Sequence, residues 1–203
     1  AVYRVTGSRT IVGSSENTFT YELYENTQAS DYTIQTGFGT LTVTNRPDDA
    51  RYEVTVTGAS GTRLYDGSGF TVSGIIANGG TVTENGTAAQ FTAGGHAYTL
   101  QGLTAAAEAV NSGMIPVPVS GNPVITDEEG NDVTAQFLIR TDSGSLTIEK
   151  RQITLTSGSE TQTYTGREVK NENVTVSGDG FASGEGASYI FGSGRTLVGK
   201  SVN

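Results

Sequence analysis

Apolar and polar residues alternate in short runs along the whole chain. Val, Ile, Leu, Tyr and Phe take every second position, with Thr, Gln and Glu between them, in residues 19–24, 32–36, 41–44, 52–57, 146–149 and 153–156. A repeat of two residues places one face of a strand on a core and the other in water. The pattern therefore predicts many half-buried β-strands.

Turn signals separate these runs. Gly pairs with Asp, Asn or Gly at residues 66–67, 78–79, 85–86, 94–95 and 130–131, and such pairs supply the positive φ angles of tight hairpins. Many short strands at this spacing are typical of a β-sandwich. Residues 103–110 contain four alanines but are too few for a stable helix. We expect a strand or an irregular crossover there, and an all-β fold.

Internal repeats are the strongest signal in the sequence. Residues 3–13 resemble 189–199 at an offset of 186, residues 34–43 resemble 139–148 at 105, and residues 60–67 resemble 159–166 at 99. The offsets indicate a module of about 90–105 residues, the size of an immunoglobulin-like sandwich. They place a complete repeat at 47–150. Residues 1–46 match the C-terminal half of a repeat, and residues 151–203 the N-terminal half of the next.

Half-repeats at both ends should leave strand edges unpaired. We therefore expect residues 151–203 of one chain to complement residues 1–46 of another. The alternative is that the true domain borders differ from the repeat borders.

Composition narrows the classes of partner. The chain has 203 residues, of which 34% are hydrophobic and none is Trp. Such a composition suits two small cores better than one large core. Twelve basic and 21 acidic residues give a net charge of −9, which argues against nucleic acid and anionic membranes as partners. No apolar run approaches the length of about 20 residues that a membrane span needs. The absence of Cys excludes disulfides and thiolate chemistry.

Four motifs carry a resemblance to a known group. They are Leu64-Tyr65-Asp66-Gly67, Gly130-Asn131-Asp132-Val133-Thr134, Gly39-Thr40-Leu41-Thr42-Val43 and Gly144-Ser145-Leu146-Thr147-Ile148. Within one module, the first motif lies near the start, the second near the end, and the last two are copies of the closing strand. Together they resemble the tandem immunoglobulin-like repeats, of the Tyr-Asp-Gly type, of Gram-positive cell-wall-anchored surface and adhesin proteins. Two departures are Tyr164-Thr165-Gly166, which lacks the Asp, and the weaker match of residues 77–95.

The resemblance implies tandem β-sandwich modules in an elongated arrangement, with neighbouring repeats as partners. It also implies an extracellular, cell-surface location, with attachment through regions outside this sequence. It supplies no catalytic residues and no cofactor to carry over.

One acidic stretch is a candidate cation site. Asp127, Glu129 and Asp132, with their polar neighbours, could offer oxygen ligands to Ca²⁺. Their spacing is not that of an EF-hand loop, and a hairpin turn at Gly130-Asn131 is the favoured interpretation. Asp48-Asp49 raise the same question at a module junction, where we favour a solvated linker. No metal site is therefore predicted.

The sequence offers little for catalysis. His96 is the only His, beside a predicted Gly94-Gly95 hairpin, and no nucleophile elbow accompanies it. A surface His is therefore the favoured interpretation. The three lysines, Lys150, Lys170 and Lys200, are not repeated between modules, which argues against an isopeptide cross-link.

Six aromatic residues could form either a sugar-stacking platform or core. Core packing is the favoured interpretation, because aromatic residues in strands are mostly buried. The six are Tyr65, Phe70, Phe91, Tyr98, Phe137 and Tyr164.

We therefore expect a structural stalk or adhesion module without catalysis. The alternative is a module that binds host glycan or host protein through loops at residues 77–114, because loops at the ends of a sandwich carry recognition.

Overall fold

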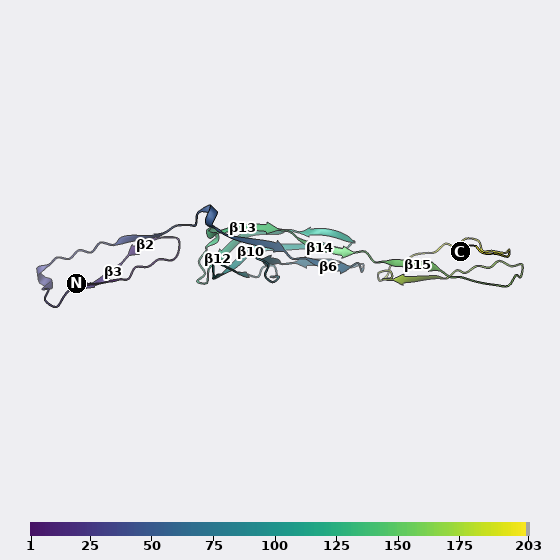
Figure 1. Ribbon diagram of the computed structural model, residues 1–203, viewed down its shortest axis with the longest axis horizontal. Coiled ribbons are helices and arrows are strands. Elements are labelled where there is room, and N and C mark those ends of the chain that lie inside the picture. The colour runs from purple at the N-terminus through teal and green to yellow at the C-terminus, as the bar shows by residue number, and fades with distance from the viewer. Residues whose placement is uncertain (202–203) are drawn as a thin grey trace.

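The computed structural model describes residues 1–201 and shows an elongated all-β molecule (Figure 1). We call residues 1–46 the N-terminal segment, 47–150 the central body and 151–201 the C-terminal segment. The two segments extend from opposite ends of the central body. The expectation of an all-β fold is confirmed, with several small mixed and antiparallel sheets.

The N-terminal segment is built from two antiparallel strand pairs. β1 (Val2–Val5) pairs with β3 (Phe19–Glu22), and β2 (Gly13–Asn17) pairs with β4 (Gly39–Val43). One 3-10 turn, η1 (Ala29–Asp31), lies between β3 and β4.

The C-terminal segment contains one antiparallel pair, β15 (Ile153–Ser157) with β16 (Val174–Gly178). An isolated bridge joins Val169 to Arg195. Residues 202 and 203, the last two of the predicted third repeat, lie outside the described residues.

The central body holds ten strands in three sheets. Their order is β12-β10-β7 with β9 also on β10, β11-β14-β6, and β13-β5-β8. Two 3-10 turns, η2 (Asp48–Ala50) and η3 (Thr134–Gln136), complete it. The strands are β5 (Tyr52–Gly58), β6 (Gly61–Leu64), β7 (Phe70–Ser73), β8 (Ile75–Ala77), β9 (Ala89–Ala93), β10 (His96–Ala109), β11 (Gly113–Val117), β12 (Val119–Thr126), β13 (Phe137–Asp142) and β14 (Gly144–Glu149). Of the stretch 103–110, expected as a strand or crossover, residues 103–109 form the second half of β10.

The first two strands of the central body pair in parallel with its last two. β5 pairs with β13 over six residue pairs, and β6 pairs with β14 over four. The two ladders meet where a side chain at Gly58 or Gly144 would collide with backbone oxygens. Glycine at both positions therefore lets the strands pass from one sheet to the next.

One hydrophobic core holds the central body together. Its fully buried members include Val54 and Val56 of β5 and Leu146 and Ile148 of β14, at alternate positions of each strand. All members of this cluster come from residues 54–148. The alternation in the sequence therefore becomes a core only in this part of the described chain.

Among residues 1–201, no helix is long and apolar enough to cross a membrane.

Candidate functional site

The acidic stretch of residues 127–134 is a hydrogen-bonded turn. Asp127 Oδ1 accepts from the backbone N–H groups of Asn131 (2.8 Å) and Glu129 (3.1 Å). The Asn131 amide also donates to both carboxylate oxygens, at 3.0 and 3.2 Å. These hydrogen bonds, those from Asn131 above all, lower the pKa of Asp127.

Asp132 belongs to a second, separate turn. Its Oδ1 accepts from Thr134 N (3.0 Å) and Thr134 Oγ1 (2.7 Å), which lowers its pKa. Thr134 Oγ1 in turn accepts from Ile125 N of β12 at 2.8 Å. The carboxylates of Asp127 and Asp132 therefore fix loop geometry.

Within the described residues, no group of three or more His, Asp or Glu side chains is placed to hold a metal ion. Glu129, the third candidate, is exposed. Asp48 and Asp49 lie in η2, where Asp48 forms an ion pair of 2.8 Å with Arg51.

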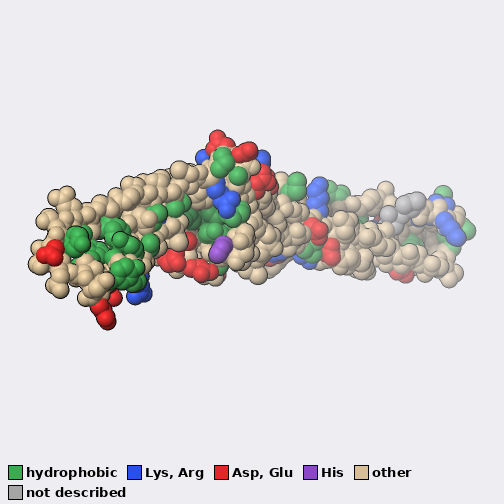
Figure 2. Space-filling view, turned by 60° about the vertical axis from the view of Figure 1, so that its left-hand side comes forward, with side chains coloured by type: hydrophobic (Ala, Val, Ile, Leu, Met, Phe, Trp, Pro, Cys, Tyr) green, Lys and Arg blue, Asp and Glu red, His purple; other side chains and the backbone are tan. Residues whose placement is uncertain are grey.

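His96 lies at the tip of the hairpin formed by β9 and β10. Gly94 and Gly95 form its turn with φ angles of 56° and 85°, as the sequence predicts. The His96 side chain is exposed (Figure 2, purple).

Four aromatic rings pack against one another in and beside the core. Phe137 makes edge contacts with Phe91 and Tyr98, with ring centroids 5.6 and 4.9 Å apart, and a tilted contact with Tyr52. Burial raises the pKa of Tyr98. The expectation of core packing is confirmed for Phe91 and Phe137, while Tyr65, Phe70 and Tyr98 pack at its margin.

Tyr164 is the exception, and core packing is wrong for it. It is 65% exposed, although it matches Tyr65 in the repeat. Tyr65 rests against the C-terminal segment, where its Oη donates to Glu185 Oε1 at 2.5 Å, which raises the pKa of Tyr65.

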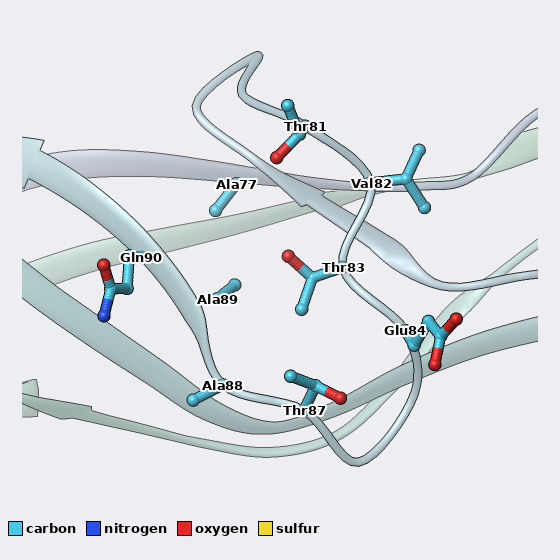
Figure 3. Close-up of a pocket in the computed structure, with 9 residues that line it drawn as sticks. All are labelled: Ala77, Thr81, Val82, Thr83, Glu84, Thr87, Ala88, Ala89 and Gln90. Carbon is cyan, nitrogen blue, oxygen red and sulfur yellow. The ribbon is translucent and has the colours of Figure 1, made fainter.

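The irregular stretch after β8 surrounds a shallow hollow of about 390 Å³ (Figure 3). Ala77, Thr83 and Ala89 face the space, while Glu84 lies at its rim. The lining is small and aliphatic or hydroxylic, without convergent charged groups. It offers little that could fix the orientation of a ligand.

Asn85 anchors this stretch to β10, a role that sequence reasoning missed. Its amide donates to Ala105 O, and its Oδ1 accepts from Ala105 N, both at 2.9 Å. The side chain thus imitates a strand partner. The Asn85-Gly86 pair signalled a turn in the sequence, but nothing there pointed to Ala105.

Polar contacts tie both segments to the central body. At the first junction, Gln136 Nε2 donates to Asn45 Oδ1 (2.7 Å), Arg46 N donates to Gln136 Oε1 (3.0 Å), and the Arg46 guanidinium donates to Tyr52 Oη at 2.6 Å. At the second junction, Arg151 donates to the carbonyls of Tyr65 (3.1 Å), Gly180 (2.6 Å) and Asp179.

Comparison with protein-family models, curated proteins and solved structures finds no match to this chain.

Proposed function

We propose that this chain is a non-catalytic stalk or adhesion segment of an extracellular bacterial surface protein. In this proposal its repeats are immunoglobulin-like sandwiches joined end to end, and its task is to carry tension. The observation that supports it best is the parallel pairing of the first two strands of the central body with its last two, β5 with β13 and β6 with β14.

The chain enters the central body at β5 and leaves it at β14. Force along the chain therefore pulls the start of β5 one way and the end of β14 the other. Because β5 and β6 pair in parallel with β13 and β14, and these strands follow the long axis (Figure 1), the force shears both ladders. In shear all the backbone hydrogen bonds of a ladder are loaded together, whereas in peeling they break one after another.

The two junctions support the same role. Arg46 and Arg151, at repeat-matched positions, both bridge a segment to the central body. Such contacts limit bending between units, and a stalk needs this to hold a distal part away from a surface.

Single-molecule force spectroscopy tests the load path. The chain has no Cys, so handles can be attached at introduced cysteines alone. Attachment at exposed Asp49 and Lys150 loads β5 and β14 in shear. Attachment at Asp49 and exposed Ala135 pulls on the same end of the β5–β13 ladder and peels it.

We expect a severalfold higher unfolding force for the 49/150 pair than for the 49/135 pair, because forced unfolding is governed by the unfolding rate under load. Thr55 N and O are turned toward Asn78, on the β8 side of β5, so Val54 and Val56 face β13 and the backbone N–H of Arg140 lies on the side of β13 that faces β5. An Arg140→Pro variant, which removes that donor, should lower the 49/150 force more than the 49/135 force. Equal forces in the two geometries would remove the main support for a load-bearing role.

A further inference from the structure

Two Asn-Gly pairs lie in the irregular stretch between β8 and β9. They are Asn78-Gly79 and Asn85-Gly86, and the sequence contains no other such pair. In an Asn-Gly pair the backbone nitrogen of the glycine can attack the side-chain amide carbon of the asparagine, because glycine has no Cβ to hinder the approach. The chemistry of the two pairs is the same, so a difference in their reactivity has to come from the fold.

The reaction is a loss of ammonia followed by an uptake of water. A bond forms between the glycine nitrogen and the asparagine Cγ, and the bond from Cγ to Nδ2 breaks. The proton of the glycine N–H leaves with the amide nitrogen as ammonia, and a succinimide ring remains. Water from the solvent then opens the ring at one of its two carbonyl groups, which gives aspartate or isoaspartate.

Both ends of the Asn85 side chain are fastened to β10. Nδ2 donates to Ala105 O and Oδ1 accepts from Ala105 N, each at 2.9 Å. Ala105 is 1% exposed, so turning the Asn85 amide away would leave a buried N–H group without a partner, which is costly. The attack requires Cγ to turn toward the nitrogen of Gly86, and the two hydrogen bonds oppose that rotation.

The Asn78 side chain is held at one end only. Its Oδ1 accepts from Thr55 N at 3.0 Å, and its Nδ2 has no hydrogen-bond partner among residues 1–201. Asn78, Gly79 and Gly80 are exposed and Thr55 is only partly buried. Water can therefore replace the acceptor when the amide turns away, and the departing nitrogen is not fastened to the protein.

The backbone conformation distinguishes Asn78 further. Among the described residues it is the only one besides glycine with a positive φ, at 48°. Figure 3 shows the tight bend between Ala77 and Thr81 that contains the pair, and a hydrogen bond of 3.0 Å from Gly80 N to Ala77 O closes this turn. A left-handed conformation carries a steric cost for a residue with a Cβ, even for asparagine. Opening the turn for the attack relieves that cost and partly offsets the lost hydrogen bonds.

We propose that Asn78 is a site of spontaneous deamidation, and that the double hydrogen bond to Ala105 protects Asn85 from the same reaction. The central body thus carries one slow, self-driven modification site at the end of β8. This inference depends only on side-chain contacts within the central body, and it is independent of the load-bearing role proposed above.

The two products differ in their effect on the end of β8. Aspartate keeps an acceptor for Thr55 N and adds a negative charge at the surface. Isoaspartate carries the backbone through Cβ, which lengthens the turn and displaces the 2.8 Å hydrogen bond from Asn78 N to Thr55 O. Because β8 pairs with β5 at Ala77 and Val56, isoaspartate should loosen the end of this ladder.

Mass spectrometry of the aged chain tests the assignment. The folded chain is incubated at mildly alkaline pH, where the glycine nitrogen loses its proton more readily, in water enriched in heavy oxygen that labels each new carboxyl group. Cleavage after Glu84 places the two pairs in different fragments. Asn78 should deamidate roughly tenfold faster than Asn85 or more, because two hydrogen bonds to a buried residue must break at Asn85 and one exposed bond at Asn78.

The unfolded chain is the matched control. In concentrated guanidinium chloride both pairs lose their contacts and should deamidate at similar rates, since glycine follows each asparagine. The proposal is overturned if the folded chain deamidates at Asn85 as fast as at Asn78. It is equally overturned if Asn78 stays intact in the folded chain while it reacts in the unfolded chain.

Two variants that imitate the aspartate product test the protection of Asn85 separately. Asn78→Asp keeps the acceptor for Thr55 N and should leave the urea midpoint nearly unchanged. Asn85→Asp puts a carboxylate oxygen where Nδ2 donates to Ala105 O, and should lower the urea midpoint because two acceptors then face each other. Equal midpoints of the two variants would show that the hydrogen bonds to Ala105 do not hold Asn85, and would overturn this part of the proposal.

Discussion

The central body and the two segments use the same sequence pattern with different results. Leu146 and Ile148 of β14 are 0% and 2% exposed, whereas their repeat matches Leu41 and Val43 of β4 are only partly buried. Both strands form, and both pair with a preceding strand, β11 and β2 respectively. Alternation therefore decides where a strand forms, and a second layer decides whether its apolar face becomes core.

The same comparison holds for a single side chain. Tyr65 and Tyr164 occupy matched positions, yet Tyr65 is held by Glu185 and Tyr164 is 65% exposed. The neighbour that covers Tyr65 belongs to the next segment along the chain. Contacts between units thus complete what each repeat leaves open.

The largest expected effect is the difference in stability cost between truncating Leu146 in the central body and truncating its repeat match Leu41 in the N-terminal segment. Leu146→Ala removes a fully buried side chain and should lower the free energy of unfolding by about 2–5 kcal/mol. Leu41→Ala removes a partly exposed one and should cost about 0.5 kcal/mol or less in the single chain. Urea denaturation of both variants measures the difference. Equal costs of the two substitutions would contradict the claim that β4 lacks a covering layer.

The sequence predicts the strands and most of the turns because both depend on residues that are close together in the chain. The alternation at residues 52–57 and 146–149 predicts β5 and β14, and Gly94-Gly95 predicts its hairpin. The parallel pairing of β5 with β13 depends on contacts between residues 85 positions apart, as in Phe137 with Tyr52. No local pattern specifies such a pairing.

The second-largest effect is expected from removing Arg151, which should weaken the contact between the central body and the C-terminal segment. Its guanidinium joins the carbonyl of Tyr65 in the central body to those of Asp179 and Gly180 in the C-terminal segment. Arg151→Ala should cost about 1–3 kcal/mol in the contact between the two parts, because hydrogen bonds from a charged donor are lost. Distances between spin labels at exposed Asp142 and Glu172 should then spread over a wider range.

Arg167→Ala is the control, since Arg167 is an exposed arginine of the same segment. It should leave the distance distribution unchanged. A narrow distribution in the Arg151→Ala variant would show that other contacts, such as Tyr65 with Glu185, fix the junction without it.

The candidate calcium ligands show where residue type alone misleads. Asp127, Glu129 and Asp132 have the chemistry of cation ligands, and their spacing left that option open. In the fold, Asp127 and Asp132 each accept hydrogen bonds within their own turn. Carboxylates that cap turns and carboxylates that bind cations look alike in a sequence, because only the backbone conformation separates them.

These turn aspartates give the smallest expected effect, a difference in acid sensitivity between the regions. Hydrogen bonds from Ser68 lower the pKa of Asp66 below its ordinary value of 3.8, as those from Asn131 and Thr134 lower the pKa of Asp127 and Asp132. A carboxyl group with a lowered pKa in the folded state stabilises the fold above its ordinary pKa. That contribution is lost as the pH falls from the ordinary value through the lower value of the folded state.

The C-terminal segment has Thr165 where the central body has Asp66, so this acid-sensitive turn is absent from it. The urea midpoint of the central body should fall on acidification, and the combined D66N, D127N and D132N variant should flatten that fall. Asn keeps an acceptor oxygen for each turn but does not titrate in this range. Thr165→Asn, at the matched position that never carried a carboxyl group, should leave the pH profile as it was. Because all three carboxyl groups are accessible to solvent and salt weakens their interactions, the effect should be small, and an unchanged acid limb in the triple variant would assign the acid sensitivity to other groups.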